Sequence, residues 1–292
     1  MGRARERALC SFVAAQGPGL DGGSACAKVE ALMASPQLQL YSLFLSPWSE
    51  RARWVLEHHG LRYRKIEHIP FLGERRLRRV LGNPAGRVTV PVLVADGQVL
   101  KDSWEIALYA DRVGHGVPLI GDAQADVRRW HDLAEHAMSA GRALVISRSI
   151  ASDEALDETV VAPRFVRPLL RPIGRYAMRW FARKYALDLD TARATAAAQP
   201  MHEALDQLRR ELAGSEYLLG RFSYADIIAA SLLQGVSPVS DRYLRIGPGT
   251  RRAWTQTELA ARHADLIAWR DRLYEKHRRA RPESTTAAGA AA

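Results

Sequence analysis

Cysteine is nearly absent from this 292-residue sequence. Its two cysteines, Cys10 and Cys26, both precede Met33, and none follows it. A disulfide framework, a cysteine metal site and a cysteine nucleophile are therefore excluded from the body of the protein. The same scarcity fits a reducing compartment, and we expect a cytoplasmic protein.

Lysine is also scarce, although the chain is strongly basic. The formal net charge is +10, yet only five of the 42 Lys and Arg residues are lysine. A charge of this size invites a nucleic-acid interpretation. The excess of arginine, together with abundant alanine, is equally typical of a genome-wide compositional bias, and no basic motif interleaved with aromatic residues appears. We therefore expect no nucleic-acid partner.

Long apolar runs are missing as well. None approaches the ~18 residues that a transmembrane helix needs, so we expect no membrane-spanning segment. Residues 1–36 show neither helical nor strand periodicity and lack the continuous apolar core of a secretory signal. We expect them to be a disordered extension, or to precede a true start at Met33, with an arginine-rich transit peptide as the alternative. The intact mass of the native protein distinguishes these cases.

From Leu38 onward, strand and helix patterns alternate. The hydrophobic periodicity and the turn residues predict, in order, a strand over 38–45, a helix over 49–59, a strand over 61–69, a short basic helix over 74–81, two strands around Asp96-Gly97 within TVPVLVADGQVLKD, and a helix over 103–113. This order predicts a small α/β domain over 37–114.

Strand signals end at the Gly- and Pro-containing linker GHGVPLIGDAQ. An apolar stripe predicts a long helix over 126–149, and later helices are expected near 173–186, 191–213, 223–236 and 257–279. The second domain, over 123–281, is therefore expected to be all helical. The small and polar residues 282–292 predict a disordered tail.

Pro91 interrupts the strong strand pattern TVPVLV. A proline removes a donor from a strand and is normally confined to an edge. One interpretation is a cis bond between Val90 and Pro91, which would turn the backbone of Val90 outward toward a ligand's main chain. The other is an ordinary edge-strand proline.

Asp102 and Ser103 lie where a strand ends and a helix begins. Ser103 can cap the helix, and the free N–H groups at a helix N-terminus attract a carboxylate. Asp102 could hold an ammonium group, so together the pair would suit the head group of an amino acid. The alternative is a helix cap with no ligand.

Ser46 lies in the stretch FLSPWSERARWV, directly before the first predicted helix. A helix N-terminus stabilises negative charge, and a hydroxyl there can donate a hydrogen bond to a thiolate. Such an environment lowers the pKa of a thiol, ordinarily about 8.5, by one unit or more. The alternative is that Ser46 or Ser49 only caps the helix. No histidine has a recognisable pairing with these serines, so a serine hydrolase is not indicated.

Together these motifs resemble the glutathione transferase superfamily. SPWSERAR, NPAGRVTVPVL and KDS occur in the order of its thioredoxin-like domain, and LLGRFSYADIIAASLL resembles a helix start of its helical domain, with Ser223 and Asp226 in a capping box. The resemblance covers residues 38–235. It implies an α/β thioredoxin-like N-terminal domain followed by an all-α C-terminal domain.

The resemblance also implies a glutathione site, with glutathione as co-substrate and no metal. Ser46 falls where the superfamily has the residue that contacts the glutathione sulfur. Val90, before a cis Pro91, would pair with the cysteinyl backbone, and Asp102 and Ser103 would hold the γ-glutamyl end.

Two further residues, Trp48 and Arg87, are candidates for the glycyl end of glutathione. SPWSERAR resembles the CPFxxR helix start of omega-like members, with Ser46 in place of their cysteine. This departure argues against disulfide exchange through the protein and for activation of bound glutathione, with Ser46 as a hydrogen-bond donor to the thiolate.

A second substrate would lie between the domains, against residues 126–149 and 150–190. The latter stretch carries an arginine at every fourth position, at Arg167, Arg171, Arg175, Arg179 and Arg183. These could form a rim that attracts an acidic electrophile or a membrane surface, or simply a solvated face. Pro168 and Pro172 argue against helix at the start of the stretch.

Three hypotheses follow. The first is a homodimeric detoxification enzyme that adds glutathione thiolate to a hydrophobic or partly anionic electrophile. The second is a non-catalytic glutathione-transferase-like binding protein, and the third is a protein that uses its basic charge on nucleic acid or a membrane. Residues 236–256 resemble nothing informative and are expected to wrap the helical domain.

Overall fold

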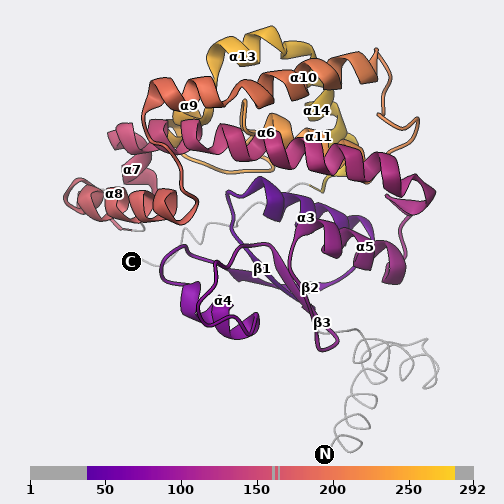
Figure 1. The fold of residues 1–292 in the computed structure, drawn as a ribbon, viewed down its shortest axis with the longest axis horizontal. Coiled ribbons are helices and arrows are strands. Elements are labelled where there is room, and N and C mark those ends of the chain that lie inside the picture. Colours follow the sequence, from indigo (N-terminus) through magenta and orange to yellow (C-terminus); the bar gives the residue numbers. More distant parts are fainter. Residues whose placement is uncertain (1–37, 160–161, 164, 280–292) are drawn as a thin grey trace, which may run out of the picture.

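The structure is a computed structural model that describes residues 38–159, 162–163 and 165–279. The predicted N-terminal extension and C-terminal tail lie outside the described residues. A four-stranded sheet and its helices form one part of the molecule, and a helical part lies against them (Figure 1).

The sheet has the strand order β2-β1-β3-β4. Its strands are β1 (Leu38–Ser42), β2 (Tyr63–Glu67), β3 (Val92–Ala95) and β4 (Gln98–Leu100). β1 pairs parallel with β2 and antiparallel with β3, and β3 pairs antiparallel with β4. The predicted strand over 38–45 is shorter in the structure because the chain leaves the sheet after Ser42 to enter the first helix.

Alternation along the strands gives the sheet two buried faces. Leu38 and Leu40 belong to the large core that includes α3 (Pro47–His58) and α5 (Ser103–Val113), whereas Tyr41 and Val92 belong to a smaller cluster with Leu77 of α4 (Glu74–Val80). Side chains of a strand alternate between faces, so each strand contributes to both layers. α3 and α5 therefore lie between the sheet and the helical domain, with α4 on the opposite side (Figure 1).

The helical domain contains a short 3-10 turn and nine α-helices within the described residues. They are η1 (Gly121–Ala123), α6 (Gln124–Ala151), α7 (Asp153–Thr159), α8 (Arg167–Lys184), α9 (Thr191–Ala197), α10 (Gln199–Leu212), α11 (Tyr224–Leu233), α12 (Pro248–Trp254), α13 (Thr257–Arg262) and α14 (Ala264–His277). The predicted fold class, a thioredoxin-like α/β domain followed by an all-helical domain, is confirmed.

α6 is the central helix of this domain, as its apolar stripe predicts. Val127, Trp130, Ala134 and Ala137 are fully buried, and α6 packs against both α10 and α11. The helix runs along the whole interface with α3 and α5 (Figure 1), which places it beside the N-terminus of α3.

α8 corrects one expectation of the sequence analysis. The helix begins at Arg167, so Pro168 and Pro172 both lie within it. Pro168 is in the first turn, where backbone N–H groups have no intrahelical partner, and its missing N–H therefore costs no helical hydrogen bond. The doubt about helix at the start of this stretch was wrong.

Two short helices were not predicted, namely α7 and α12. They pack against each other, and the Glu158 carboxylate of α7 accepts hydrogen bonds from the backbone N–H groups of Gly249 and Thr250 at 2.8 and 2.7 Å. This contact fixes part of the segment 236–256 against the helical domain. Across the described ranges, no helix has both the length and the apolar character needed to cross a membrane.

Candidate functional site

The three motifs singled out in the first domain meet at one edge of the sheet. Tyr41 of β1 pairs with Val92 of β3, so the end of β1, which leads to Ser46, lies beside Pro91. Leu93 pairs with Leu100 of β4, so Asp102 follows the end of β4 at the same edge. Strand register therefore gathers the start of α3, the Val90-Pro91 bond and the start of α5 from three separate segments.

Ser46 is the N-cap of α3. Its backbone is extended, with φ −76° and ψ 122°, and its Oγ accepts a hydrogen bond from the N–H of Ser49 at 3.3 Å. Ser49 is buried, and its own Oγ accepts from the N–H of Leu43 at 3.1 Å. Capping uses only an acceptor lone pair of Ser46, so its O–H remains able to donate to an anion. The capping and ligand-binding alternatives are therefore compatible.

The Val90–Pro91 peptide bond is cis, which is the first of the two alternatives. The paired part of β3 begins only at Val92, so Val90 lies outside the strand register. The backbone of Val90 is thus placed at the sheet edge rather than within the ladder.

Asp102, not Ser103, is the N-cap of α5. Its Oδ1 accepts a hydrogen bond from the N–H of Glu105 at 2.8 Å, and the residue is exposed. This corrects the expectation that Ser103 caps the helix. Ser103 is the first helical residue, and its buried Oγ has no hydrogen-bond partner among the described residues. A buried hydroxyl without a partner is costly, so this position fits a group that is completed by a ligand.

A buried polar cluster joins α3 to the helical domain just behind Ser46. The Arg51 guanidinium is fully buried and contacts Glu135 of α6 at 2.7 Å and Ser231 of α11 at 2.5 Å. The indole N–H of Trp48 donates to the same carboxylate at 2.7 and 2.8 Å. Glu135 thus fixes two α3 residues, and the indole N–H of Trp48 is directed at the protein rather than at a ligand.

Arg142 and Tyr185 complete the site from the helical domain. The Cζ atom of Arg142 lies 4.4 Å from the ring centroid of Trp48 and 4.4 Å from that of Tyr185. On the other side, the Cζ atom of Arg87 lies 5.5 Å from the Tyr185 ring. The four side chains form a continuous row from the loop before β3 to α3, in which two guanidinium groups alternate with two aromatic rings.

Arg142 keeps free hydrogen-bond donors within this row. Neither a hydrogen bond nor an ion pair engages its guanidinium among the described residues, apart from the two ring contacts. Burial lowers the pKa of Arg142, and the positive charge of Arg87 acts in the same direction, while Tyr185 and Glu135 oppose it. A partly desolvated guanidinium with unused donors is suited to an anion.

Of the predicted site residues, Ser46, Val90, Pro91, Asp102 and Ser103 converge on the sheet edge, and Trp48 and Arg87 flank it through the aromatic row. The residues missed by sequence reasoning are Glu135, Arg142 and Tyr185. Arg142 directly follows Gly141 of the predicted α6 stripe, but no sequence signal connects it to Trp48. Within the described residues there is no group of metal-ligating side chains that could hold an ion.

Most of the first domain matches a known family. Residues 45–113 match the family model described as Glutathione S-transferase, N-terminal domain. No curated protein matches the sequence at a significant level.

Several solved structures share the fold. The glutathione S-transferase CsGST63524 of Ceriporiopsis subvermispora, in complex with glutathione, superposes with a TM-score of 0.57 at 17% identity, over 85% of this chain and 100% of its own. The beta-etherase LigF of Sphingobium sp. strain SYK-6 gives 0.54 at 19% identity, over 82% and 95%. A glutathione S-transferase of Methylobacillus flagellatus KT with glutathione bound gives 0.53 at 20% identity, over 82% and 95%.

Proposed function

Given that the chain belongs to the glutathione S-transferase superfamily, with the N-terminal domain on residues 45–113 and the two-part fold, we propose that it binds glutathione and transfers it to a small electrophile. The reaction would join the glutathione sulfur to an electrophilic carbon of the second substrate. The protein's contribution is to bind both molecules and to keep the thiol ionised.

The observation that carries the proposal is the convergence of three motifs on one sheet edge. Glutathione would place its cysteinyl main chain against Val90, its γ-glutamyl end against Asp102 and Ser103, and its sulfur near Ser46. The unpartnered Oγ of Ser103 supports the γ-glutamyl position, because a ligand carboxylate would supply the partner that the described residues do not.

Ser46 would act as a hydrogen-bond donor to the thiolate. It lies at the N-terminus of a twelve-residue helix, where the backbone N–H groups favour negative charge. Each unit by which the thiol pKa falls corresponds to about 1.4 kcal/mol of preferential stabilisation of the thiolate. The step needs no base from the protein, because the thiol proton is released to water when the thiolate forms.

The row of Arg87, Tyr185, Arg142 and Trp48 supports an anionic group on one or both ligands. Arg87 would face the glycyl carboxylate of glutathione, as the resemblance implies. Arg142 would hold an anionic group of the second substrate, whose apolar part would lie against the aromatic rings. The electrophile would then be hydrophobic with a carboxylate or similar group.

Three Ser46 variants separate capping from thiolate activation. Ser46→Ala removes both the capping acceptor and the O–H donor, Ser46→Asp keeps a good cap but cannot donate, and Ser46→Thr keeps both. Titration of the ultraviolet absorbance of bound glutathione is expected to give a thiol pKa at least about one unit higher for the Ala and Asp variants than for the wild type and the Thr variant. Thermal stability is expected to fall only for Ala.

The outcomes are distinct. If glutathione binds and the Ala and Asp variants keep the wild-type thiol pKa, Ser46 only caps the helix. If the wild type forms the thiolate yet converts no member of a panel of electrophiles, disulfides and peroxides, the protein is a binding protein rather than an enzyme. The expected homodimer and cytoplasmic location stay predictions, for which light scattering and fractionation of cells are the tests.

A further inference from the structure

One face of the molecule exposes large apolar side chains that no part of the described chain covers. They belong to the loop before α4 and to the segment that contains α8. Their exposed fractions are 55% for Ile69, 49% for Phe71, 73% for Leu72, 83% for Phe165, 78% for Leu169, 64% for Ile173 and 56% for Tyr176. We name this set, with α4 and α8, the α4/α8 face.

The apolar residues of α8 form a stripe opposite its buried side. Leu169, Ile173 and Tyr176 follow one another at intervals of four and three residues, so they share one side of the helix. Phe165 lies two residues before the helix begins at Arg167. Gly174 and Ala182, which are buried, lie on the other side. The stripe is therefore the outer surface of α8, and packing within the described chain does not account for it.

Contacts between α4 and α8 make the face continuous. The Lys184 Nζ atom at the end of α8 lies 2.6 Å from a carboxylate oxygen of Glu74 at the start of α4, and both side chains are nearly buried. The Phe71 ring packs edge-on against Tyr176 and Trp180, with centroid distances of 6.3 and 5.7 Å. The loop residues and the α8 stripe thus belong to one surface.

Exposed arginines lie on both helices of this face. Arg75, Arg76 and Arg79 of α4 and Arg179 and Arg183 of α8 are exposed, and within the described ranges none of them is in an ion pair. The acidic residues nearby are engaged: Glu74 binds Lys184, while Asp153 and Asp157 bind Arg171 and Arg175. The face therefore combines exposed apolar groups with uncompensated positive charge.

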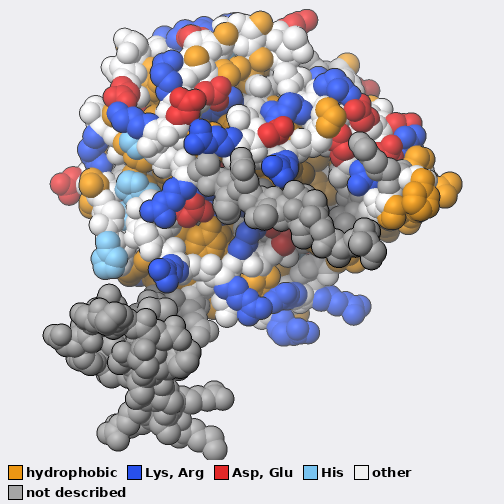
Figure 2. Space-filling view, turned by 180° about the vertical axis from the view of Figure 1, so that it is seen from behind, with side chains coloured by type: hydrophobic (Ala, Val, Ile, Leu, Met, Phe, Trp, Pro, Cys, Tyr) orange, Lys and Arg blue, Asp and Glu red, His pale blue; other side chains and the backbone are white. Residues whose placement is uncertain are grey.

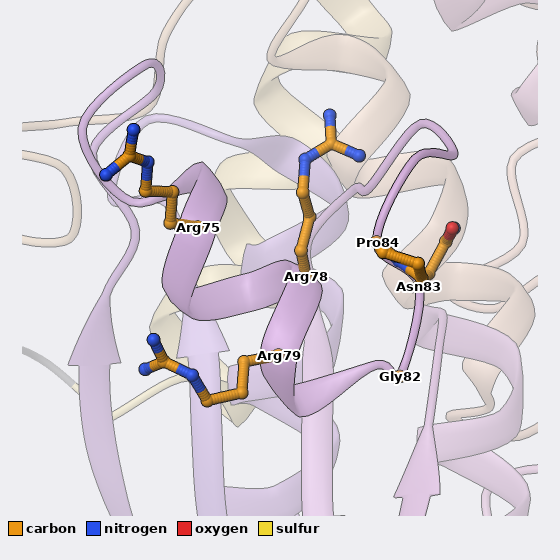
Figure 3. Close-up of a pocket in the computed structure, with 6 residues that line it drawn as sticks. All are labelled: Arg75, Arg78, Arg79, Gly82, Asn83 and Pro84. Carbon is orange, nitrogen blue, oxygen red and sulfur yellow. The ribbon is translucent and has the colours of Figure 1, made fainter.

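The view from behind shows both components. In Figure 2, hydrophobic side chains gather at the end of the molecule where α8 lies, and Lys and Arg side chains project below them where α4 lies. A hollow of about 450 Å³ on α4 is lined by Arg75, Arg78, Arg79, Gly82, Asn83 and Pro84. Figure 3 shows that the three guanidinium groups point apart rather than toward one point, which suits many spread anionic groups better than one small anion.

We propose that the α4/α8 face docks on the surface of an anionic lipid bilayer. The apolar stripe and the loop at 69–72 would enter the boundary between head groups and acyl chains, and the arginines would meet lipid phosphates. A second copy of the chain is a poorer occupant, because it would bring the same unpaired arginines together. Nucleic acid would use the charge but leave the aliphatic side chains exposed to water.

Co-sedimentation with vesicles tests the proposal on the full chain. Binding is expected to vesicles of equal parts phosphatidylglycerol and phosphatidylcholine, to weaken with added salt, and to be absent with pure phosphatidylcholine. Replacing Arg75, Arg76 and Arg79 together by Gln is expected to weaken binding on the order of 100-fold. The pair Leu169→Ser and Ile173→Ser is expected to weaken it at least about tenfold.

Matched controls carry the same changes elsewhere. For the apolar variant, the control is Val117→Ser, which removes a side chain that is 71% exposed and lies outside the face. For the arginine variant, the control replaces three exposed arginines of other helices by Gln, namely Arg112, Arg210 and Arg272. Circular dichroism would confirm that every variant is folded.

Three results would overturn the proposal. The first is no binding to anionic vesicles, and the second is equal loss in the control and face variants. The third is evidence for a different partner, with vesicle binding unchanged or absent. Such evidence would be a change from dimer to monomer in the α8 variant, or a loss of nucleic-acid binding in the arginine variant. None of these readouts depends on glutathione, so the proposed transferase activity stands or falls separately.

Discussion

Arg142 is, with Arg87, one of two guanidinium groups of the proposed site that no hydrogen bond or ion pair engages among the described residues. It is held by cation–π contacts, since its Cζ atom lies 4.4 Å from the ring centroids of both Trp48 and Tyr185. These ring contacts hold the guanidinium in place without using its N–H groups. Its position on α6 is fixed by the helix, so a ligand would meet a preorganised donor.

Replacing Arg142 by Met should therefore separate charged from neutral electrophiles. For a carboxylate-bearing electrophile we expect kcat/KM to fall roughly 10- to 100-fold, because a hydrogen bond to a charged group contributes about 1.5–3 kcal/mol. A neutral electrophile of similar shape should be converted at nearly the wild-type rate. Arg129→Met on the same helix, which removes a guanidinium paired with Glu211, is the control. Equal loss for both classes of electrophile would assign Arg142 a structural role instead.

At the scale of residues, the sequence was informative where local chemistry decides the position. Ser46, Asp102 and Ser103 could be predicted because helix starts and strand ends have recognisable residues. Glu135, Arg142 and Tyr185 could not, because their role depends on how the helical domain packs on α3. Trp48 and Glu135, for example, are 87 positions apart, and neither motif nor periodicity indicates that they touch.

At the scale of elements, α11 begins at a fully buried capping box. Asp226 accepts hydrogen bonds from the N–H of Leu218 at 2.9 Å and from the N–H and O–H of Ser223 at 2.8 and 2.7 Å. Burial raises the pKa of Asp226 to about 6, although these hydrogen bonds act to lower it. Because all ten residues of α11 are buried, this carboxyl group anchors the centre of the helical domain.

Asp226→Ala is expected to lower the free energy of unfolding by roughly 3 kcal/mol, because it leaves three donors without an acceptor, and the two from Ser223 are buried. Ser223→Ala removes only one of them and should cost about 1 kcal/mol. Urea unfolding at constant pH measures both changes. Asp190→Ala, which removes the N-cap of the exposed helix α9, is the matched control and should have a smaller effect than Asp226→Ala. Similar losses for Asp226→Ala and Asp190→Ala would contradict this account of α11.

The positions of helices were more predictable than their ends. The continuous helix predicted over 191–213 is divided at Ala198, because a helical Pro200 would lack its N–H and would clash with the carbonyl of residue 196. The helix predicted over 257–279 is divided at His263, where no glycine or proline marks the break. α12 does have a sequence signal, since Pro248 occupies its first turn, but seven residues are too few for periodicity to reveal.

At the scale of the whole molecule, an arginine near the C-terminal end of the described residues forms ion pairs with α3, the first described helix. Arg278, directly after α14, contacts Glu50 of α3 at 2.8 Å and also pairs with Glu57. Burial alone would raise the pKa of Glu50, but the guanidinium groups of Arg278 and Arg53 lower it to about 2. The end of α14 is thereby joined to α3, the helix that Ser46 caps.

This pairing predicts an acid-sensitive contribution to stability. The pKa of Glu50 falls from an ordinary 4.5 to about 2 on folding, so its contribution is complete above pH 4.5 and is lost as the pH falls toward 2. The amount is about 3 kcal/mol. Unfolding midpoints across this interval should fall more steeply for the wild type than for Glu50→Gln.

The exposed Glu258→Gln is the control, and it should retain the wild-type pH dependence. The Glu50→Gln variant should also be less stable than the wild type at neutral pH, because the buried guanidinium of Arg53 loses its carboxylate partner and that of Arg278 keeps only Glu57. Parallel pH profiles for the wild type and Glu50→Gln would show that this ion pair does not contribute as described.

Arg51 makes the boundary between the two domains unsuitable for cutting or exchange. The linker after α5 separates the two domains in the sequence. In space, however, the Arg51 guanidinium of the first domain contacts three residues of the helical domain, namely Glu135, Ser231 and Met138. Separated from the helical domain, α3 would present this charge on an apolar surface. Combined with a foreign helical domain, it would be buried without a counter-charge. The two domains of this molecule are therefore matched to each other, and any chimera with the helical domain of another protein of this fold would have to carry the acceptors of Arg51 along with it.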